Sequence, residues 1–86
     1  MPKPEPFEPV LSGKASSYFV TLPKRKQRRL LDLIYRLASF PGQLGDYEST
    51  DEAGRKVQHF EAGPLVISFW SDNSVHELRI TDIEEL

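Results

Sequence analysis

The chain has 86 residues, no cysteine and a formal net charge of −2. A chain of this length forms one domain with a thin core, and the missing cysteines exclude a disulfide scaffold, a thiolate zinc site and a cysteine nucleophile. The longest apolar run, residues 65–67, is far too short for a membrane span, and no signal peptide is visible at the N-terminus. We therefore expect a cytoplasmic protein that uses neither a metal nor an organic cofactor.

The small net charge conceals an asymmetry between the two halves of the chain. Residues 1–45 carry eight basic and three acidic groups, a net charge of +5, whereas residues 46–86 carry three basic and ten acidic groups, a net charge of −7. One end of the molecule is therefore suited to approach a polyanion, and the other would repel it.

The first segment in chain order is rich in proline. Four of the seven prolines lie within residues 1–10, where they remove backbone donors and disfavour helix. The composition predicts a flexible or polyproline-like arm over residues 1–16, either a frayed terminus or a tail that binds a partner. A single folded domain is then expected over residues 17–86.

The next two elements are predicted to be a strand and a helix. Residues 17–22 are aromatic and β-branched, which is typical of a short strand and leaves no second helix before residue 24. Residues 24–39 predict an amphipathic helix, because Leu30, Leu33, Ile34 and Leu37 follow the i, i+3, i+4, i+7 spacing. Pro41 then ends it.

The second half of the chain predicts a loop followed by three strands. Residues 41–54 lack periodicity and predict a connecting loop, in which residues 46–48 could start a strand; strand-like runs follow at residues 56–61, 65–70 and 75–82. The apolar stripe of the helix must be buried against this antiparallel sheet of about four strands, in the order β-α-β-β-β, so a two-layer α+β domain is expected. If residues 56–61 form an edge of the sheet, they can pair with a second copy of the chain in a homodimer.

The hairpin sequence GPLVISFWSDNSVHELRI, residues 63–80, resembles the C-terminal hairpin of the RelE/ParE toxin superfamily. The preceding strand and basic amphipathic helix fit the same pattern, so the resemblance covers about residues 17–83. It implies a RelE-like fold and a small toxin of a toxin–antitoxin system, neutralised by a cognate antitoxin protein. The RelE branch cleaves mRNA in the ribosomal A site, and the ParE branch poisons DNA gyrase.

Four residues are the candidates for catalysis. RNA cleavage without a metal needs cations that stabilise the phosphorane and groups that move protons. Arg55, Lys56 and His59 are closely spaced before and on one predicted strand, and Arg79 matches a basic position that the resemblance places on the last strand. We predict that the three cations contact phosphate and that His59 carries the proton. The alternative is that they are solvated strand charges, with Arg79 paired to Glu77 or to a neighbouring strand.

A second candidate site lies at the start of the predicted helix. Five basic residues, the basic cluster, fall within six positions: Lys24, Arg25, Lys26, Arg28 and Arg29. Cations at a helix N-terminus oppose the macrodipole, by about 0.3–1 kcal/mol each at low salt. The cluster therefore predicts a surface for phosphate or for an acidic antitoxin segment. The alternative is a solvated polar face that aids solubility.

A non-enzymatic interaction module is the alternative function. The chain ends in Asp82-Ile83-Glu84-Glu85-Leu86, which contains no tyrosine and no basic residue, whereas ribonucleases of the family often carry such a group there. The acidic second half of the chain also favours this alternative, in which the sheet or the helix binds a partner protein.

Overall fold

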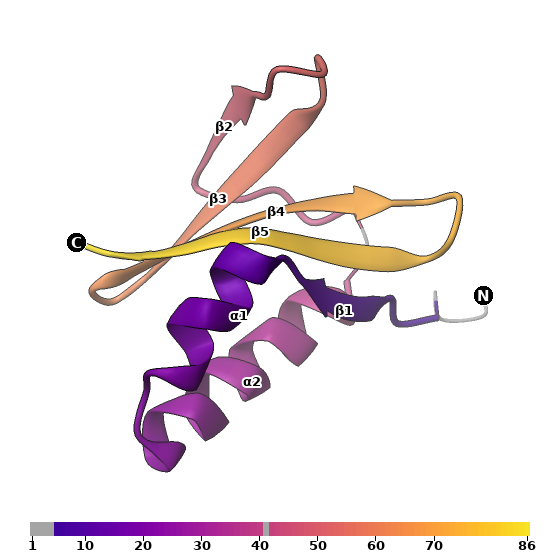
Figure 1. Ribbon diagram of the computed structural model, residues 1–86. Coiled ribbons are helices and arrows are strands. Elements are labelled where there is room, and N and C mark those ends of the chain that lie inside the picture. Colours follow the sequence, from indigo (N-terminus) through magenta and orange to yellow (C-terminus); the bar gives the residue numbers. More distant parts are fainter. Residues whose placement is uncertain (1–4, 41) are drawn as a thin grey trace.

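A computed structural model describes residues 5–40 and 42–86 of the protein (Figure 1). The elements are β1 (Glu8–Leu11), α1 (Gly13–Val20), α2 (Lys24–Ala38), β2 (Tyr47–Thr50), β3 (Lys56–Ala62), β4 (Leu65–Asp72) and β5 (Glu77–Glu85). The class is α+β, as the sequence predicts.

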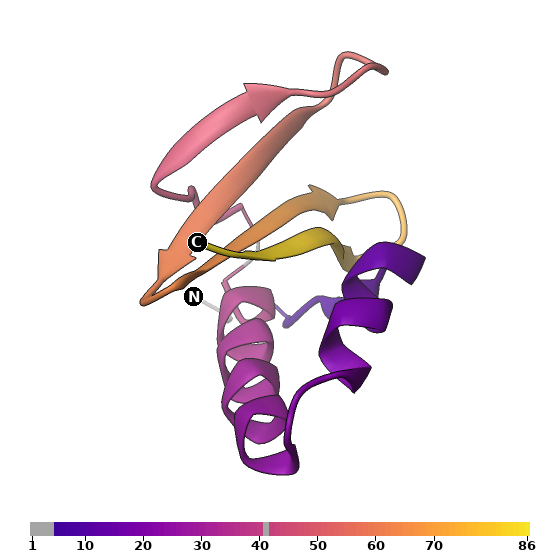
Figure 2. The ribbon, with the colours of Figure 1, turned by 60° about the vertical axis from the view of Figure 1, so that its left-hand side comes forward.

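One mixed sheet carries two helices on one face. The strand order is β1-β5-β4-β3-β2; β1 pairs with β5 in parallel, and the other neighbours are antiparallel. Figures 1 and 2 show α1 and α2 as a helical hairpin below the sheet, while the β2–β3 hairpin rises away at an angle to β4 and β5. The other face of the sheet, here called the outer face, carries no helix formed by residues 5–40 or 42–86.

The core forms where α2 meets the sheet. Leu30, Ile34 and Leu37 are at most 3% exposed, and they cluster with Ile67, Phe69, Leu78, Ile80 and Ile83 of β4 and β5. The predicted amphipathic helix and its burial against the sheet are therefore confirmed. The helix ends at Ala38, with Ser39 as its C-cap.

The strand predicted over residues 17–22 is wrong, because residues 17–20 belong to α1 and Thr21 is the C-cap of that helix. Ser12 caps the helix by accepting a hydrogen bond from the N–H of Ala15 at 3.1 Å. Ala15, Tyr18, Phe19 and Leu22 recur at helical spacing and all pack in or against the core. Burial of this stripe outweighs the β propensity of the aromatic residues, so two helices pack on the sheet instead of one.

The flexible arm predicted over residues 1–16 is corrected for residues 8–16; residues 1–4 lie outside the described part of the chain. Glu8–Leu11 forms an edge strand, and Ala15 is fully buried. The N–H of Phe7 donates to the carbonyl of Ala38 at 2.8 Å, and the Ser12 hydroxyl donates to the carbonyl of Thr81 at 2.8 Å. Pro9 is tolerated because β1 has only one strand neighbour.

The three predicted C-terminal strands are present as β3, β4 and β5, but β3 is not an edge. β2 covers it on one side and β4 on the other, so the edge proposed for homodimer pairing is occupied within the chain. A bulge opposite the Ser68–Phe69 step leaves Thr81 without a partner on β4. The bulge shifts the alternation of side chains between the two faces of β5, so that Leu78, Ile80 and Ile83 are the buried residues.

Candidate functional site

The outer face of the sheet carries most of the predicted catalytic residues. Ile67 and Phe69 of β4 belong to the core under the helices, so their neighbours Ser68 and Trp70 point to the outer face. Trp70 pairs with Arg79 on β5, and Ser68 pairs with His59 on β3. Arg79, beside Trp70, and His59, beside Ser68, therefore lie on the same face of the sheet.

Two of the predicted arginines converge on Trp70. The Cζ atom of Arg55 lies 4.4 Å from the centroid of the Trp70 ring, and the Cζ atom of Arg79 lies 5.6 Å from it. Both distances allow cation–π attraction. The same side chains line a cavity of about 330 Å³ with residues of β1 and β5: Val10, Leu11, Ser12, Arg55, Trp70, Arg79, Ile80 and Thr81.

Carboxylates hold both arginines in place. The Nε atom of Arg55 lies 3.0 Å from Asp51. Arg79 bonds through Nε to Asp72 at 3.2 Å and through Nη2 to Glu77 at 2.8 Å, which includes the pairing that the alternative interpretation of Arg79 predicts. The guanidinium groups are thus oriented, but their charges are already compensated.

Hydrogen bonds lower the pKa of both aspartates below its ordinary value. For Asp51 the main cause is the bond that it accepts from the backbone N–H of Arg55. For Asp72 the main cause is the bond from the hydroxyl of Ser74, at 2.6 Å. The arginine partners lower both pKa values further. Both carboxylates are therefore charged at neutral pH.

His59 is held in a row of hydroxyl groups that spans three strands. Its Nε2 atom lies 2.7 Å from the Ser49 hydroxyl of β2, and its Nδ1 atom lies 2.8 Å from the Ser68 hydroxyl of β4. The ring of Tyr47 stacks on the imidazole, with centroids 4.7 Å apart and an interplanar angle of 11°. The imidazole is therefore fixed in its plane and at both nitrogens.

Lys56 is the predicted catalytic residue that lies apart from the others. Strand alternation places it on the face opposite Val57 and His59. Its Nζ atom lies 3.9 Å from Glu48, and Glu48 also accepts a hydrogen bond from Gln58 on the same face. The structure brings Arg55 and Arg79 together and places His59 on their face, but it does not add Lys56.

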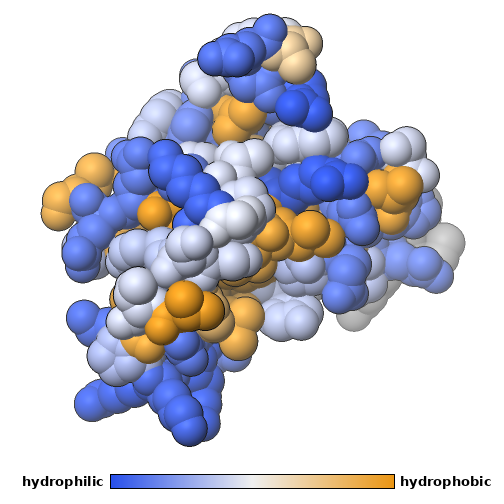
Figure 3. Space-filling view, in the orientation of Figure 1, coloured by the Kyte–Doolittle hydropathy of each residue, from blue (hydrophilic) through white to orange (hydrophobic). Residues whose placement is uncertain are grey.

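The basic cluster forms the exposed start of α2. Among the described residues, none of its five side chains makes an ion pair. Figure 3 shows the tip of the helical hairpin as hydrophilic, next to apolar surface. This charge is therefore uncompensated at close range, in contrast to that of Arg55 and Arg79.

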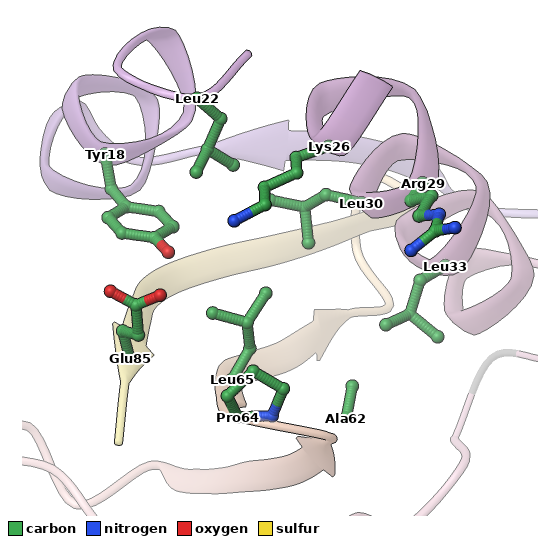
Figure 4. A pocket seen from close by; sticks show the side chains of 10 residues that line it. All are labelled: Tyr18, Leu22, Lys26, Arg29, Leu30, Leu33, Ala62, Pro64, Leu65 and Glu85. Carbon is green, nitrogen blue, oxygen red and sulfur yellow. The ribbon is translucent and has the colours of Figure 1, made fainter. Parts of the chain in front are cut away.

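An apolar groove of about 240 Å³ runs between the helical hairpin and the end of the sheet. Figure 4 shows its lining: Tyr18, Leu22, Lys26, Arg29, Leu30, Leu33, Ala62, Pro64, Leu65 and Glu85. Lys26 and Arg29 belong to the basic cluster, and Glu85 faces the Tyr18 hydroxyl across the groove. Burial, followed by the charge of Glu85, raises the pKa of Tyr18. The groove thus has apolar walls with two cations on its helical side.

Sequence reasoning missed the residues that organise the outer face. Trp70 is not among the predicted site residues, yet it is the platform for two arginines. Ser49 and Ser68 are not among the predicted site residues either, because only the cross-strand register shows that they flank His59. The alternation of Ser68 and Trp70 on one strand was the available signal.

The described residues contain no group of three or more His, Cys, Asp or Glu side chains that could hold a metal ion. Neither of the two helices in this part of the chain is long and apolar enough to cross a membrane.

Comparisons with known proteins identify the fold. No protein-family model matches the chain, and no curated protein sequence gives a significant match. Among solved structures, the chain is similar to a chain of the toxin–antitoxin complex RelBE2 from Mycobacterium tuberculosis. The TM-score is 0.75 at 15% sequence identity, over 94% of this chain and 99% of that one. The chain therefore has a RelE-like α+β fold, as its hairpin sequence predicts.

Proposed function

We propose that this protein is the toxin of a toxin–antitoxin pair and that it cleaves RNA at the outer face, with mRNA on the ribosome as substrate. The convergence of Arg55 and Arg79 on Trp70 carries the proposal. Two oriented cations beside an aromatic ring fit a phosphate and its neighbouring base. The fold shared with a chain of a toxin–antitoxin complex supports the same assignment.

The chemistry follows from the charge that develops on the phosphate. When the ribose 2′-oxygen attacks the adjacent phosphorus and gives its proton to water, negative charge builds up on the phosphorane oxygens, and fixed cations stabilise it. The bond from phosphorus to the 5′-oxygen then breaks, and the leaving 5′-oxygen takes a proton from water. Arg79 and Arg55 supply those cations once the substrate displaces their carboxylate partners. A base that stacks on Trp70 contributes about 1–3 kcal/mol to binding. His59 supplies the imidazole on the same face, and Lys56 has no part in this arrangement.

The antitoxin partner is proposed to use the other side of the molecule. An apolar side chain of an acidic segment fits the groove beside α2, where Lys26 and Arg29 meet its carboxylates. Lys24, Arg25 and Arg28 extend the same positive surface beyond the groove and raise the association rate, because they attract the acidic segment from a distance.

Induced expression in a bacterial host tests the proposal. We expect growth arrest by the wild-type chain and relief of the arrest by the double variant Arg55→Ala, Arg79→Ala. Lys56→Ala is the matched control and should still arrest growth. Purified protein should cleave mRNA on programmed ribosomes and leave gyrase supercoiling unchanged. A wild-type chain that spares growth, ribosome-bound mRNA and gyrase would contradict the toxin assignment.

A non-enzymatic interaction module is the second candidate, and the ion pairs of the outer face favour it. Asp51, Asp72 and Glu77 compensate the two arginines, so these pairs would serve the stability of the sheet. In that case the double arginine variant changes the free energy of unfolding and leaves every RNA readout unchanged, while partner binding depends on the basic cluster alone.

A further inference from the structure

The hydrogen bonds of His59 indicate which of its two ring nitrogens carries the proton. A neutral imidazole has one N–H donor and one acceptor nitrogen, and its neighbours decide which is which. Here both neighbours are serine hydroxyls, which can donate or accept. The choice therefore depends on where each hydroxyl hydrogen has another acceptor.

The two serines differ in this respect. Ser68 is 8% exposed, and Nδ1 of His59 is the only hydrogen-bond partner of its hydroxyl among the described residues. If Nδ1 carried the proton, the hydroxyl of Ser68 would have to accept from it, and its own hydrogen would then have no acceptor among the described residues, which is unfavourable at a buried residue. Ser49 is exposed, so water can satisfy its hydroxyl in either arrangement.

We infer that Ser68 donates to Nδ1 and thereby fixes His59 as the neutral tautomer with its proton on Nε2, aimed at Ser49 on the outer face. The Nε2–H group is then a preset hydrogen-bond donor for an anionic oxygen that replaces the Ser49 hydroxyl. Given the proposed function, that oxygen belongs to a phosphate of the RNA. Ser68 is a positioning residue, and His59 is a binding group.

This arrangement changes the role predicted for His59. A base must present a lone pair to the substrate, but the lone pair of Nδ1 faces the buried hydroxyl of Ser68. The neutral imidazole therefore polarises an oxygen through a hydrogen bond and does not remove a proton. The stacked ring of Tyr47 keeps the imidazole in the plane that this bond requires.

Nitrogen NMR of the imidazole tests the tautomer directly, without any substrate. In the wild-type protein at a pH where His59 is neutral, we expect Nδ1 to resonate as an unprotonated nitrogen and Nε2 as a protonated one. Ser68→Ala should shift His59 towards a mixture of both tautomers. Ser49→Ala, at the other end of the same ring, should leave the tautomer unchanged. A protonated Nδ1 in the wild-type protein would overturn the inference, whether or not Ser68→Ala folds.

RNA binding and cleavage test the role of His59 as a donor. Glutamine keeps an N–H donor but cannot exchange a proton at neutral pH, so His59→Gln should retain binding and cleavage within a few-fold. His59→Ala should lose about tenfold or more, the loss expected for a hydrogen bond to a charged group. Equal losses in both variants would contradict a donor role. If the wild-type protein neither binds nor cleaves RNA, the proposed function fails, while the NMR result still decides the tautomer.

Discussion

The two basic regions of this protein differ in whether their cationic side chains are fixed by ion pairs. On the outer face, Arg55 and Arg79 are fixed by Trp70 and by three carboxylates. At the start of α2, five cations stand exposed with no ion pair among the described residues. The arginines of the sheet are oriented, but their charges are compensated. The cations of the helix keep their charges uncompensated, but no ion-pair partner in the described part of the chain orients them.

This difference indicates a division of labour. Uncompensated charge acts over about a Debye length and raises encounter rates, but flexible side chains specify little geometry. Oriented guanidinium groups recognise a phosphate at close range, after it has displaced their carboxylates. A polyanion or an acidic partner would therefore be attracted by the helix, whereas a reacting phosphate would be positioned only by the sheet.

The comparison presumes that one core holds both regions, and Phe69→Ala tests this most severely. Phe69 is 1% exposed and shares the core cluster with Ile34 of α2, while its neighbour Trp70 lies on the outer face. We expect the free energy of unfolding to fall by about 3–5 kcal/mol, a large part of the stability of a small domain. Urea unfolding followed by fluorescence of the single tryptophan measures it. Phe40→Ala, at a residue 61% exposed, is the control and should cost less than about 0.5 kcal/mol.

A glycine next to β2 allows the outer face to be disturbed alone. A Cβ atom on Gly45 would lie 2.5 Å from the carbonyl oxygen of His59, which accepts a bond from the N–H of Asp46 at 2.7 Å. We expect Gly45→Ala to cost about 1–3 kcal/mol, as overpacking does, and to speed amide hydrogen exchange in β2 and β3 while α2 keeps its protection.

The matched control for that change is Gly13→Ala at the start of α1. A Cβ atom there has no neighbour within 4 Å, so the variant should be neutral or more stable by about 0.4–1 kcal/mol. Similar losses of stability in both variants would show that backbone contact with His59 is not what requires glycine at position 45.

The sequence predicts the elements whose pattern is local and misses those that depend on distant partners. Leu30, Ile34 and Leu37 repeat at helical spacing over about two turns, so α2 could be recognised without any neighbour. In β1, Pro9 argues against a strand, and only the parallel pairing with β5 stabilises one there. Residues 17–22 have the composition of a strand, but the cap at Ser12 and burial of one side against the core favour a helix there.

The candidate site divides in the same way. Arg55 and Arg79 are 24 positions apart in the chain, and their meeting at Trp70 depends on the pairing of β4 with β5 and on the turn before β3. Their residue type makes them candidates for a phosphate site, but only the register of the strands shows that they lie close together. The same register separates Lys56 from His59, since a shift of three residues reverses the face.

Salt dependence should separate the two regions in solution. Replacing Lys24, Arg25 and Arg28 by alanine should reduce the slope of log K against log salt, for a single-stranded RNA oligonucleotide, by about 2. The double variant Arg55→Ala, Arg79→Ala should reduce it less, because its carboxylates already neutralise the lost charges. Fluorescence anisotropy at several salt concentrations measures both slopes. Equal reductions would show that the ion pairs leave the sheet arginines as free as the helix cations.

Acid should weaken the outer face and spare the helix, which is the smallest of the expected effects. The pKa values of Asp51 and Asp72 are lower in the folded protein than their ordinary value of 3.8. Their contribution to stability is therefore complete above that value and is lost as the pH falls through the folded pKa. Asp51→Asn and Asp72→Asn should each flatten the fall in urea midpoint below about pH 4.

Glu52→Gln is the control for these variants, because Glu52 makes no ion pair among the residues that the structure describes. It should leave the acid limb of the stability curve unchanged, and so should Lys24→Ala, since Lys24 forms no ion pair with a carboxylate of the described residues. An acid limb that Asp51→Asn and Asp72→Asn leave as steep as in the wild-type protein would mean that the carboxylates do not hold the arginines in solution. The outer face would then be as free to bind anions as the start of α2, and the contrast between the two regions would vanish.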